Sequence, residues 1–266
     1  MAPAPAPALS LARRLRAGET VYSGWCFLPA PLVAETIARE GFDAVVLDAQ
    51  HGLWDTASAF AAIAAVCQGG AAPVVRVPLN DFAFVSRALD GGAEAIIAPM
   101  INTPTDARAF AAAAKYPPLG ERSYGPFRAM SLQGSALQGR ATPLDYLREA
   151  NTATLTLAMI ETPTALANVD DIAATPGIDA LFIGPYDLST SLSAGQAQDI
   201  MAPEVETAID RIRDAAVKAG KIPGIFCRDA ERAVAMTKRG FRFITVGNDV
   251  GFLRDSAAAA LKALHR

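Results

Sequence analysis

Eight short apolar segments alternate with longer amphipathic segments along the chain, and this alternation restricts the fold more than any other feature. The predicted strands are residues 21–27, 44–49, 73–78, 95–100, 154–161, 180–185, 222–227 and 243–247. Helical patterns occupy residues 31–40, 56–68, 82–91, 105–115, 163–175, 203–219, 229–239 and 250–264. Several of these patterns begin with a Pro, Thr, Asn or Asp helix-start signal and end at a glycine.

Eight strand–helix pairs in 266 residues predict a (β/α)8 TIM barrel. The strands are almost continuously apolar, as expected for parallel strands covered on both faces. We therefore expect one domain over residues 1–266, with a short disordered N-terminal tail of about residues 1–8. A doubly wound sheet is the alternative, but its usual glycine-rich phosphate loop after the first strand is replaced here by WCFLPAP.

Composition excludes several functional classes. The 24 basic and 27 acidic residues leave no surplus positive charge for nucleic acid. The longest apolar segment, residues 57–67, is well short of the roughly 18 residues that span a bilayer. Three cysteines without a CxxC pair favour a reducing compartment, and the N-terminal arginines follow the apolar residues, the reverse of a secretory signal. We expect a cytoplasmic protein.

Residues 116–151 break the strand–helix alternation. This segment is too long for a plain connection and is rich in Gly, Arg and Ser. Long loops in barrels are usually functional or contribute to an oligomer contact.

Polar side chains cluster where the predicted strands end, which is where barrel active sites lie. They are Asp48, Gln50, His51, Arg76, Glu161, Asp187, Asn248 and Asp249, and the first strand carries Trp25. Asp48 lies three residues before His51 and could accept a proton from its imidazole, making His51 a general base, although a lone loop histidine is often structural. Arg76 interrupts an apolar strand, which fits a carboxylate or enolate clamp or a structural ion pair.

Glu161 and Asp187 follow neighbouring strands, so their carboxylates can converge. Two carboxylates would form a partial shell for a hard divalent cation, whereas the alternative is a pair of unrelated helix caps. The backbone of Gly184, Pro185, Tyr186 and Asp187 could receive a substrate carboxylate if a helical turn starts there.

The positions of the five lysines argue against a Schiff-base mechanism. None of Lys115, Lys218, Lys221, Lys238 and Lys262 is predicted at the catalytic end of a strand. A Schiff-base mechanism requires a lysine there, so carbanion chemistry in this barrel would need a metal instead.

Taken together, the ordered motifs LDAQH, VVRVPLND, PPLGERSYG, MIET, FIGPYDLS and VGND resemble the HpcH/HpaI aldolase family, from about Val21 to the C-terminus. The resemblance implies a barrel of the phosphoenolpyruvate/pyruvate-domain type. It implies a metal-dependent (class II) aldolase that cleaves 4-hydroxy-2-oxo acids to pyruvate or a related 2-oxo acid, such as hydroxypyruvate, plus an aldehyde.

The resemblance also implies residue roles. Glu161 and Asp187 match two metal ligands, for Mg²⁺, Mn²⁺ or Co²⁺; Arg76 matches an arginine at the keto or enolate oxygen. Asp48 and His51 match a pair of residues that transfers protons. The backbone near Tyr186 and Asp187 matches a site that binds the substrate carboxylate, and Trp25 matches an aromatic residue near the substrate entrance. A homo-oligomer, commonly a hexamer with exchanged C-terminal helices, is also implied.

Three positions depart from the family pattern. Gln50 replaces a common Glu, Met159 a common Gln and Tyr186 a common Ala. These changes affect the water network, the metal affinity and the shape of the donor pocket. Two other functions remain open at this point: a CoA-ester lyase of the same superfamily, and a non-catalytic barrel that binds a metabolite or serves as an oligomeric scaffold.

Overall fold

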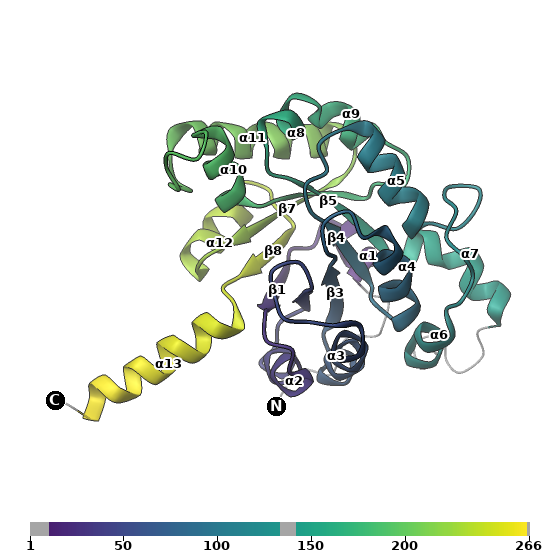
Figure 1. Cartoon of the computed structure of the whole chain (residues 1–266), viewed down its shortest axis with the longest axis horizontal. Helices are drawn as coiled ribbons and strands as arrows, with labels where there is room; N and C mark the ends of the chain where they lie inside the picture. The colour runs from purple at the N-terminus through teal and green to yellow at the C-terminus, as the bar shows by residue number, and fades with distance from the viewer. Residues whose placement is uncertain (1–10, 134–141, 265–266) are drawn as a thin grey trace.

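Eight parallel strands form a closed barrel in the computed structural model, which describes residues 11–133 and 142–264. Each strand pairs with the next along the chain, and β8 pairs with β1 (Figure 1). The strands are β1 (Val21–Cys26), β2 (Ala44–Asp48), β3 (Ala72–Arg76), β4 (Ala95–Ala98), β5 (Leu155–Ile160), β6 (Ala180–Ile183), β7 (Ile222–Cys227) and β8 (Phe243–Val246). The predicted TIM barrel is confirmed, and the eight strands lie within two residues of their predicted bounds.

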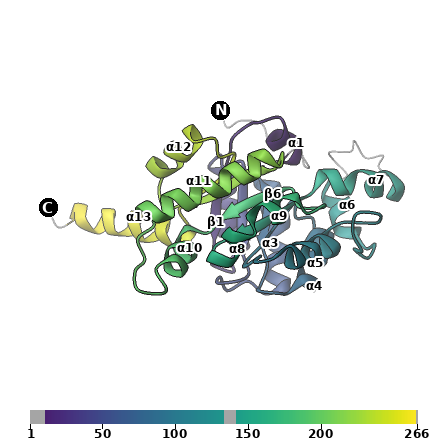
Figure 2. The ribbon, with the colours of Figure 1, turned by 90° about the horizontal axis from the view of Figure 1, so that it is seen from above.

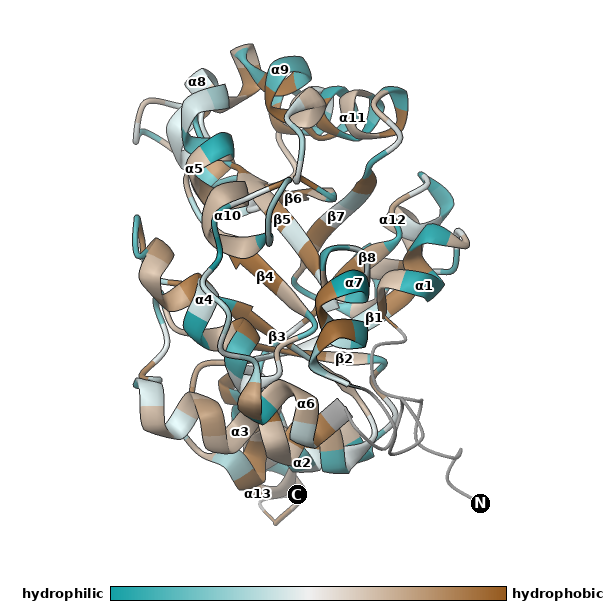
Figure 3. Ribbon diagram, turned by 90° about the vertical axis from the view of Figure 1, so that its right-hand side faces the viewer, coloured by the Kyte–Doolittle hydropathy of each residue, from teal (hydrophilic) through white to brown (hydrophobic). Residues whose placement is uncertain are grey.

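Alternate residues of each strand face opposite sides of the barrel wall, so two apolar cores form. In β2, Val46 belongs to the cluster inside the barrel, whereas Val45 belongs to the cluster between strands and helices. Both sets are apolar because both faces of the sheet are covered, and the strands are accordingly brown along much of their length in Figure 3. The filled interior leaves the carboxyl ends of the strands as the place for a site.

The helices that follow the strands largely match the predicted segments. They are α2 (Pro31–Arg39), α3 (Thr56–Gly69), α4 (Phe82–Gly91), α5 (Pro104–Ala114), α8 (Pro163–Ala167), α9 (Val169–Ala174), α10 (Pro185–Leu192), α11 (Pro203–Lys218), α12 (Ala230–Lys238) and α13 (Asp249–Leu264). The single helix predicted over residues 163–175 is instead two helices, α8 and α9, which meet at Asn168.

Within the described residues, four helices lie outside the predicted alternation, one of which is α10, directly after β6. The first, α1 (Leu11–Arg16), buries Leu11 and Leu15 in the cluster inside the barrel, and Leu11 lies within hydrogen-bond distance of Glu94, just before β4. Helix α1 therefore covers the amino-terminal end of the barrel. The long segment between α5 and β5 contains α6 (Phe127–Gln133) and α7 (Pro143–Ala153). The predicted tail, residues 1–8, lies outside the described residues.

The last helix extends away from the barrel (Figures 1 and 2). Asp249 at its start is buried, but residues 252–264 are all exposed. No helix within the described ranges has both the length and the apolar character required to cross a membrane.

Candidate active site

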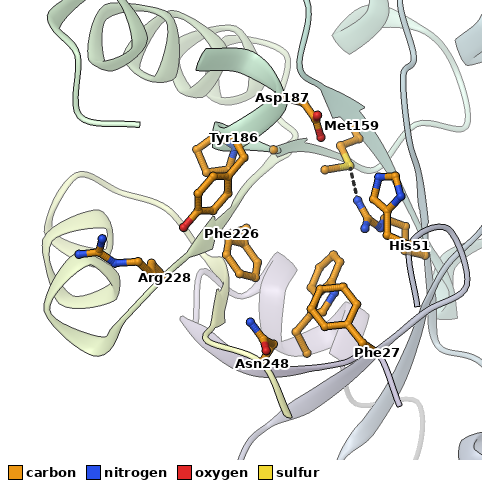
Figure 4. A pocket seen from close by; sticks show the side chains of 12 residues that line it. Phe27, His51, Met159, Tyr186, Asp187, Phe226, Arg228 and Asn248 are labelled. Atoms are coloured by element: carbon orange, nitrogen blue, oxygen red, sulfur yellow. Dashed lines mark hydrogen bonds between the residues drawn. The ribbon is translucent and has the colours of Figure 1, made fainter. Parts of the chain in front are cut away.

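A pocket of about 280 Å³ opens at the carboxyl ends of the strands (Figure 4). It is lined by Trp25, Phe27, His51, Arg76, Met159, Gly184, Pro185, Tyr186, Asp187, Phe226, Arg228 and Asn248. The fold thus brings together most of the side chains that the sequence placed at strand ends. Two of the predicted site residues, Asp48 and Glu161, lie beneath the pocket wall and are 0% and 1% exposed.

Arg76 is held by a buried, bidentate ion pair. Its Nε donates to Asp48 Oδ1 at 2.8 Å and its Nη2 to Asp48 Oδ2 at 2.5 Å, while the guanidinium lies 4.9 Å from the centre of the Trp25 ring. Trp25 Nε1 also donates to Asp48 Oδ2, at 3.2 Å. Two of the three guanidinium nitrogens are therefore committed to Asp48. Among the described residues, the third nitrogen, Nη1, contacts only the weak acceptor Met159 Sδ at 3.9 Å and remains available for a substrate oxygen.

The geometry at His51 differs from the expected imidazole–Asp48 pair. Asp48 Oδ1 accepts from the backbone N–H groups of Gln50 and His51, at 3.0 and 3.3 Å. Within the described part of the chain, no hydrogen bond to the His51 imidazole is found. The reason is that Arg76 and these amides occupy the Asp48 carboxylate, so Asp48 positions the His51 loop through its backbone. The imidazole itself lies at the pocket wall, exposed to solvent.

Glu161 is a buried carboxylate with one oxygen lacking a partner. Its Oε1 accepts from the backbone N–H of Met100 at 2.8 Å, whereas its Oε2 is buried and, while the neighbouring Asp187 is ionised, accepts no hydrogen bond from the described residues. Burial, together with the negative charge of Asp187, raises the pKa of Glu161 to about 7, although the Met100 amide and the charge of Arg76 oppose this shift. An unpaired buried carboxylate oxygen is costly unless a cation or donor joins it.

Asp187 lies next to Glu161 although it comes from a different strand–helix connection, the one that follows β6. It is the third residue of α10, whose cap residue Gly184 follows β6, and β6 pairs with β5. The amides of Tyr186 and Asp187 lie in the first helical turn, where backbone N–H groups have no partner within the helix. The helical turn required for the predicted carboxylate site is therefore present.

The close approach of Gly184 to Glu161 has a testable consequence. A Cβ at residue 184 would lie 2.5 Å from both Glu161 Oε2 and Met159 Cε. We expect Gly184→Ala to displace the Glu161 carboxylate and to lower the free energy of unfolding by about 1–3 kcal/mol. The activation free energy of the catalysed reaction should rise by at least the same amount. Gly251→Ala is the matched control, since a Cβ there makes ordinary contacts of 3.4 Å or more. Thermal unfolding and the rate of turnover measure the two effects; unchanged values for Gly184→Ala would contradict this packing.

Four lining residues are absent from the predicted site: Phe27, Met159, Phe226 and Arg228; Asn248 is predicted at a strand end without an assigned role. Phe226 and Arg228 flank Cys227, the last residue of β7. The strand-end rule points to Arg228, which is polar and directly follows β7, but not to the apolar Phe226. Apolar lining residues such as Phe27 carry no such signal, since they resemble core residues in the sequence.

The lysines lie away from the pocket, as predicted. Lys115 is buried, and its Nζ donates to Thr154 O and Asp179 Oδ2, at 2.8 and 2.7 Å, just before β5 and β6. Lys221 Nζ donates to the carbonyl of Ile178, which also precedes β6. Both lysines therefore support the amino-terminal end of the barrel, opposite to the pocket.

The closed parallel barrel carries at its carboxyl end a pocket with an anchored arginine and two adjacent acidic side chains, an arrangement typical of a (β/α)8-barrel enzyme. The HpcH/HpaI aldolase/citrate lyase family model matches residues 24–256. The chain belongs to this family and is an aldolase. This membership favours the enzymatic interpretation over a non-catalytic barrel.

Known relatives cover nearly the whole chain. A hydroxypyruvate/pyruvate aldolase of Rhizorhabdus wittichii is 42% identical over 91% of this chain and 92% of its own length. A crystal structure of a family protein from Burkholderia cenocepacia superposes with a TM-score of 0.87 and is 34% identical, covering 97% of this chain and 100% of that one. The CitE protein of Mycobacterium tuberculosis, solved with magnesium and pyruvate, has a TM-score of 0.58 at 18% identity over 89% of this chain and 88% of its own, and shows the shared fold alone.

Proposed function

We propose that this aldolase is metal-dependent and reversibly cleaves 4-hydroxy-2-oxo acids into pyruvate or hydroxypyruvate plus an aldehyde. The observation that carries the proposal is the unpaired, buried Oε2 of Glu161 beside Asp187. Relatives named hydroxypyruvate/pyruvate aldolases support the choice of donor.

Glu161 and Asp187 fit a hard divalent cation such as Mg²⁺, Mn²⁺ or Co²⁺. Both present carboxylate oxygens, and while both groups are ionised no donor among the described residues satisfies the buried Oε2. When bound, the cation supplies positive charge that polarises the donor carbonyl and stabilises the negative charge formed during cleavage. Within the described residues no third acidic, histidine or cysteine side chain completes a cluster, so water and substrate oxygens would fill the remaining positions.

The chain's own residues bind and orient the donor. Arg76 Nη1 faces the pocket with its guanidinium fixed by Asp48, so it can donate to the enolate oxygen without reorganising. The free amides of Tyr186 and Asp187, at the positive end of α10, receive the donor carboxylate. The His51 imidazole is exposed and moves protons between solvent and substrate, with water as the intermediary.

Proton exchange on the donor alone tests this function. We expect the protein to catalyse deuterium incorporation at C3 of pyruvate in D₂O, as followed by proton NMR. Chelation should abolish the exchange and added Mn²⁺ or Mg²⁺ should restore it. His51→Ala should slow exchange by about 10²–10³-fold. Two results would refute the proposal: exchange that persists in the chelated protein, or a covalent pyruvate adduct of the protein that is trapped by borohydride.

We further propose that the chain forms a homo-oligomer, a hexamer in line with the family resemblance, through its last helix. Residues 252–264 are exposed, and an apolar groove between α2 and α13 includes the exposed side chains of Leu32 and Leu253. Burying such surface against another copy is favourable. Light scattering should give six times the chain mass, and deletion of residues 252–266 should give smaller species. A monomeric full-length protein would refute this assembly.

A cytoplasmic location is proposed on the cysteines, since Cys26, Cys67 and Cys227 are all free thiols. Cell fractionation would test it, and recovery in a secreted or membrane fraction would contradict it.

A further inference from the structure

The pocket has two chemically different sides. Figure 4 shows Asp187, Met159 and His51 on one side of the pocket and Tyr186 and Phe226 on the other, with Phe27 and Asn248 below them. Glu161 and Arg76 belong to the first side through their contacts with Asp187 and Met159. A substrate in this pocket therefore meets charged groups at one end and, at the other, aromatic rings with the Asn248 amide beside them.

The aromatic side is a connected wall of rings from separate elements. Phe226 of β7 makes an edge-on contact with Trp25 of β1, with ring centres 5.5 Å apart. The Tyr186 ring, from α10, meets the other side of Phe226 at 6.1 Å. Trp25 is only 2% exposed and is fixed by Asp48, so Phe226 packs against a rigid neighbour. The wall is thus preformed. Its side chains therefore lose little conformational freedom when a ligand ring binds against them.

The wall faces the part of the substrate that the donor site does not hold. This step rests on the proposed function, in which the charged side binds the 2-oxo acid. Aldol addition joins C3 of the donor, after loss of one proton, to the aldehyde carbon, and the aldehyde oxygen gains that proton. The substituent on the aldehyde carbon then lies beyond C3 of the donor, and the apolar lining available to it includes Phe226, the Tyr186 ring and Phe27.

The one basic side chain on the aromatic side does not direct its charge into the pocket. Arg228 points away from the cavity in Figure 4. Its side chain is 72% exposed, and its Nε donates to Asp229 at 3.2 Å. An acceptor with a terminal carboxylate would therefore meet a solvated, already paired guanidinium, whereas an apolar ring would meet the wall directly.

From these observations we propose that the acceptor subsite, formed by Phe226 and Tyr186 in the pocket that Phe27 also lines, selects aldehydes with an aryl substituent. Flat rings gain offset or edge-on contacts with Phe226 and Tyr186 and displace water from apolar surface. Small polar aldehydes such as glycolaldehyde make no ring contacts and displace little water from apolar surface. The preference for aryl aldehydes is therefore measured as the ratio of kcat/KM for benzaldehyde to kcat/KM for glycolaldehyde.

The test compares benzaldehyde, glycolaldehyde and succinic semialdehyde as acceptors with pyruvate, in the metal-loaded full-length protein. We expect Phe226→Leu and Tyr186→Ala each to lower the benzaldehyde-to-glycolaldehyde ratio of kcat/KM by about 10-fold. Tyr186→Phe, which keeps the ring, should retain the wild-type ratio. Comparing ratios between variants cancels the different intrinsic reactivities of the aldehydes. Benzyl alcohol, which has the ring but no carbonyl, should inhibit competitively against the aldehyde and less so in Phe226→Leu.

Each outcome decides the matter. An unchanged ratio in both ring-removing variants, with activity retained, would overturn the aryl subsite while leaving the proposed aldol function intact. A wild-type preference for succinic semialdehyde that Arg228→Ala removes would overturn it in favour of an anionic acceptor. Failure of pyruvate deuterium exchange in the wild-type protein would instead refute the proposed function, and the subsite with it. Melting temperatures near the wild-type value confirm that each variant is folded.

Discussion

Replacement of Arg76 by lysine is expected to lower kcat/KM for aldol cleavage by about 10³-fold. The guanidinium uses Nε and Nη2 to hold Asp48 and leaves Nη1 toward the pocket. A lysine carries one ammonium group, so it cannot bridge both Asp48 oxygens and also donate to the substrate from the same fixed position. The expected loss falls mainly on kcat, because the interaction strengthens as charge develops on the substrate.

Arg108→Lys provides the matched control, since Arg108 is an exposed residue of α5 whose guanidinium contacts only Thr105. We expect unchanged kinetics for this control. Arg76→Lys should also lower the free energy of unfolding by about 1–3 kcal/mol, because Asp48 is fully buried and loses half of a bidentate pair. A kcat/KM within 10-fold of wild type would contradict the role assigned to Nη1.

Glu161→Gln is expected to separate activity from stability. Activity should fall by about 10³-fold or more, because the amide removes one of the two anionic groups proposed to hold the cation. The amide oxygen can still accept from Met100, so the local backbone need not change. In metal-free protein at pH 8, the free energy of unfolding should stay equal or rise by about 1 kcal/mol, because a buried, unpaired negative charge has been removed.

The exposed Glu121 supplies a matched control, and Glu121→Gln should leave both quantities unchanged. Isothermal titration with Mn²⁺ gives an independent measurement, with weaker binding expected for Glu161→Gln alone. Destabilisation of metal-free Glu161→Gln by several kcal/mol would indicate that the carboxylate has a structural partner, and would count against the proposed cation site.

The fold was predictable because the barrel depends on local, repeated patterns. Each strand is apolar on both faces and each following helix has its own start signal, such as Asp55 before α3 or Thr103 before α5. The split between α8 and α9 and the presence of α1 were not predicted. Both depend on contacts distant in sequence, as when Leu11 and Leu15 fill the end of the barrel.

The candidate site was predictable where charge interrupts an apolar strand end. Arg76, Glu161 and Asp187 were found in this way, and the structure places Arg76 and Asp187 at the pocket and Glu161 directly beneath it. The partner of Asp48 could not be assigned in this way. Sequence spacing suggested His51, three residues away, but the register of β2 with β3 places Asp48 opposite Arg76, 28 residues along the chain.

The sequence by itself determined the barrel, the end of the barrel that carries the site, and the acidic and basic residues gathered there. Those features follow from periodicity and from the cost of placing charge in an apolar strand. Only the tertiary structure decided which oxygen of Glu161 lacks a partner, which nitrogen of Arg76 is free, and that Phe226 and Tyr186 form a wall. These depend on the register and closure of eight strands, which bring side chains together regardless of their separation in the chain.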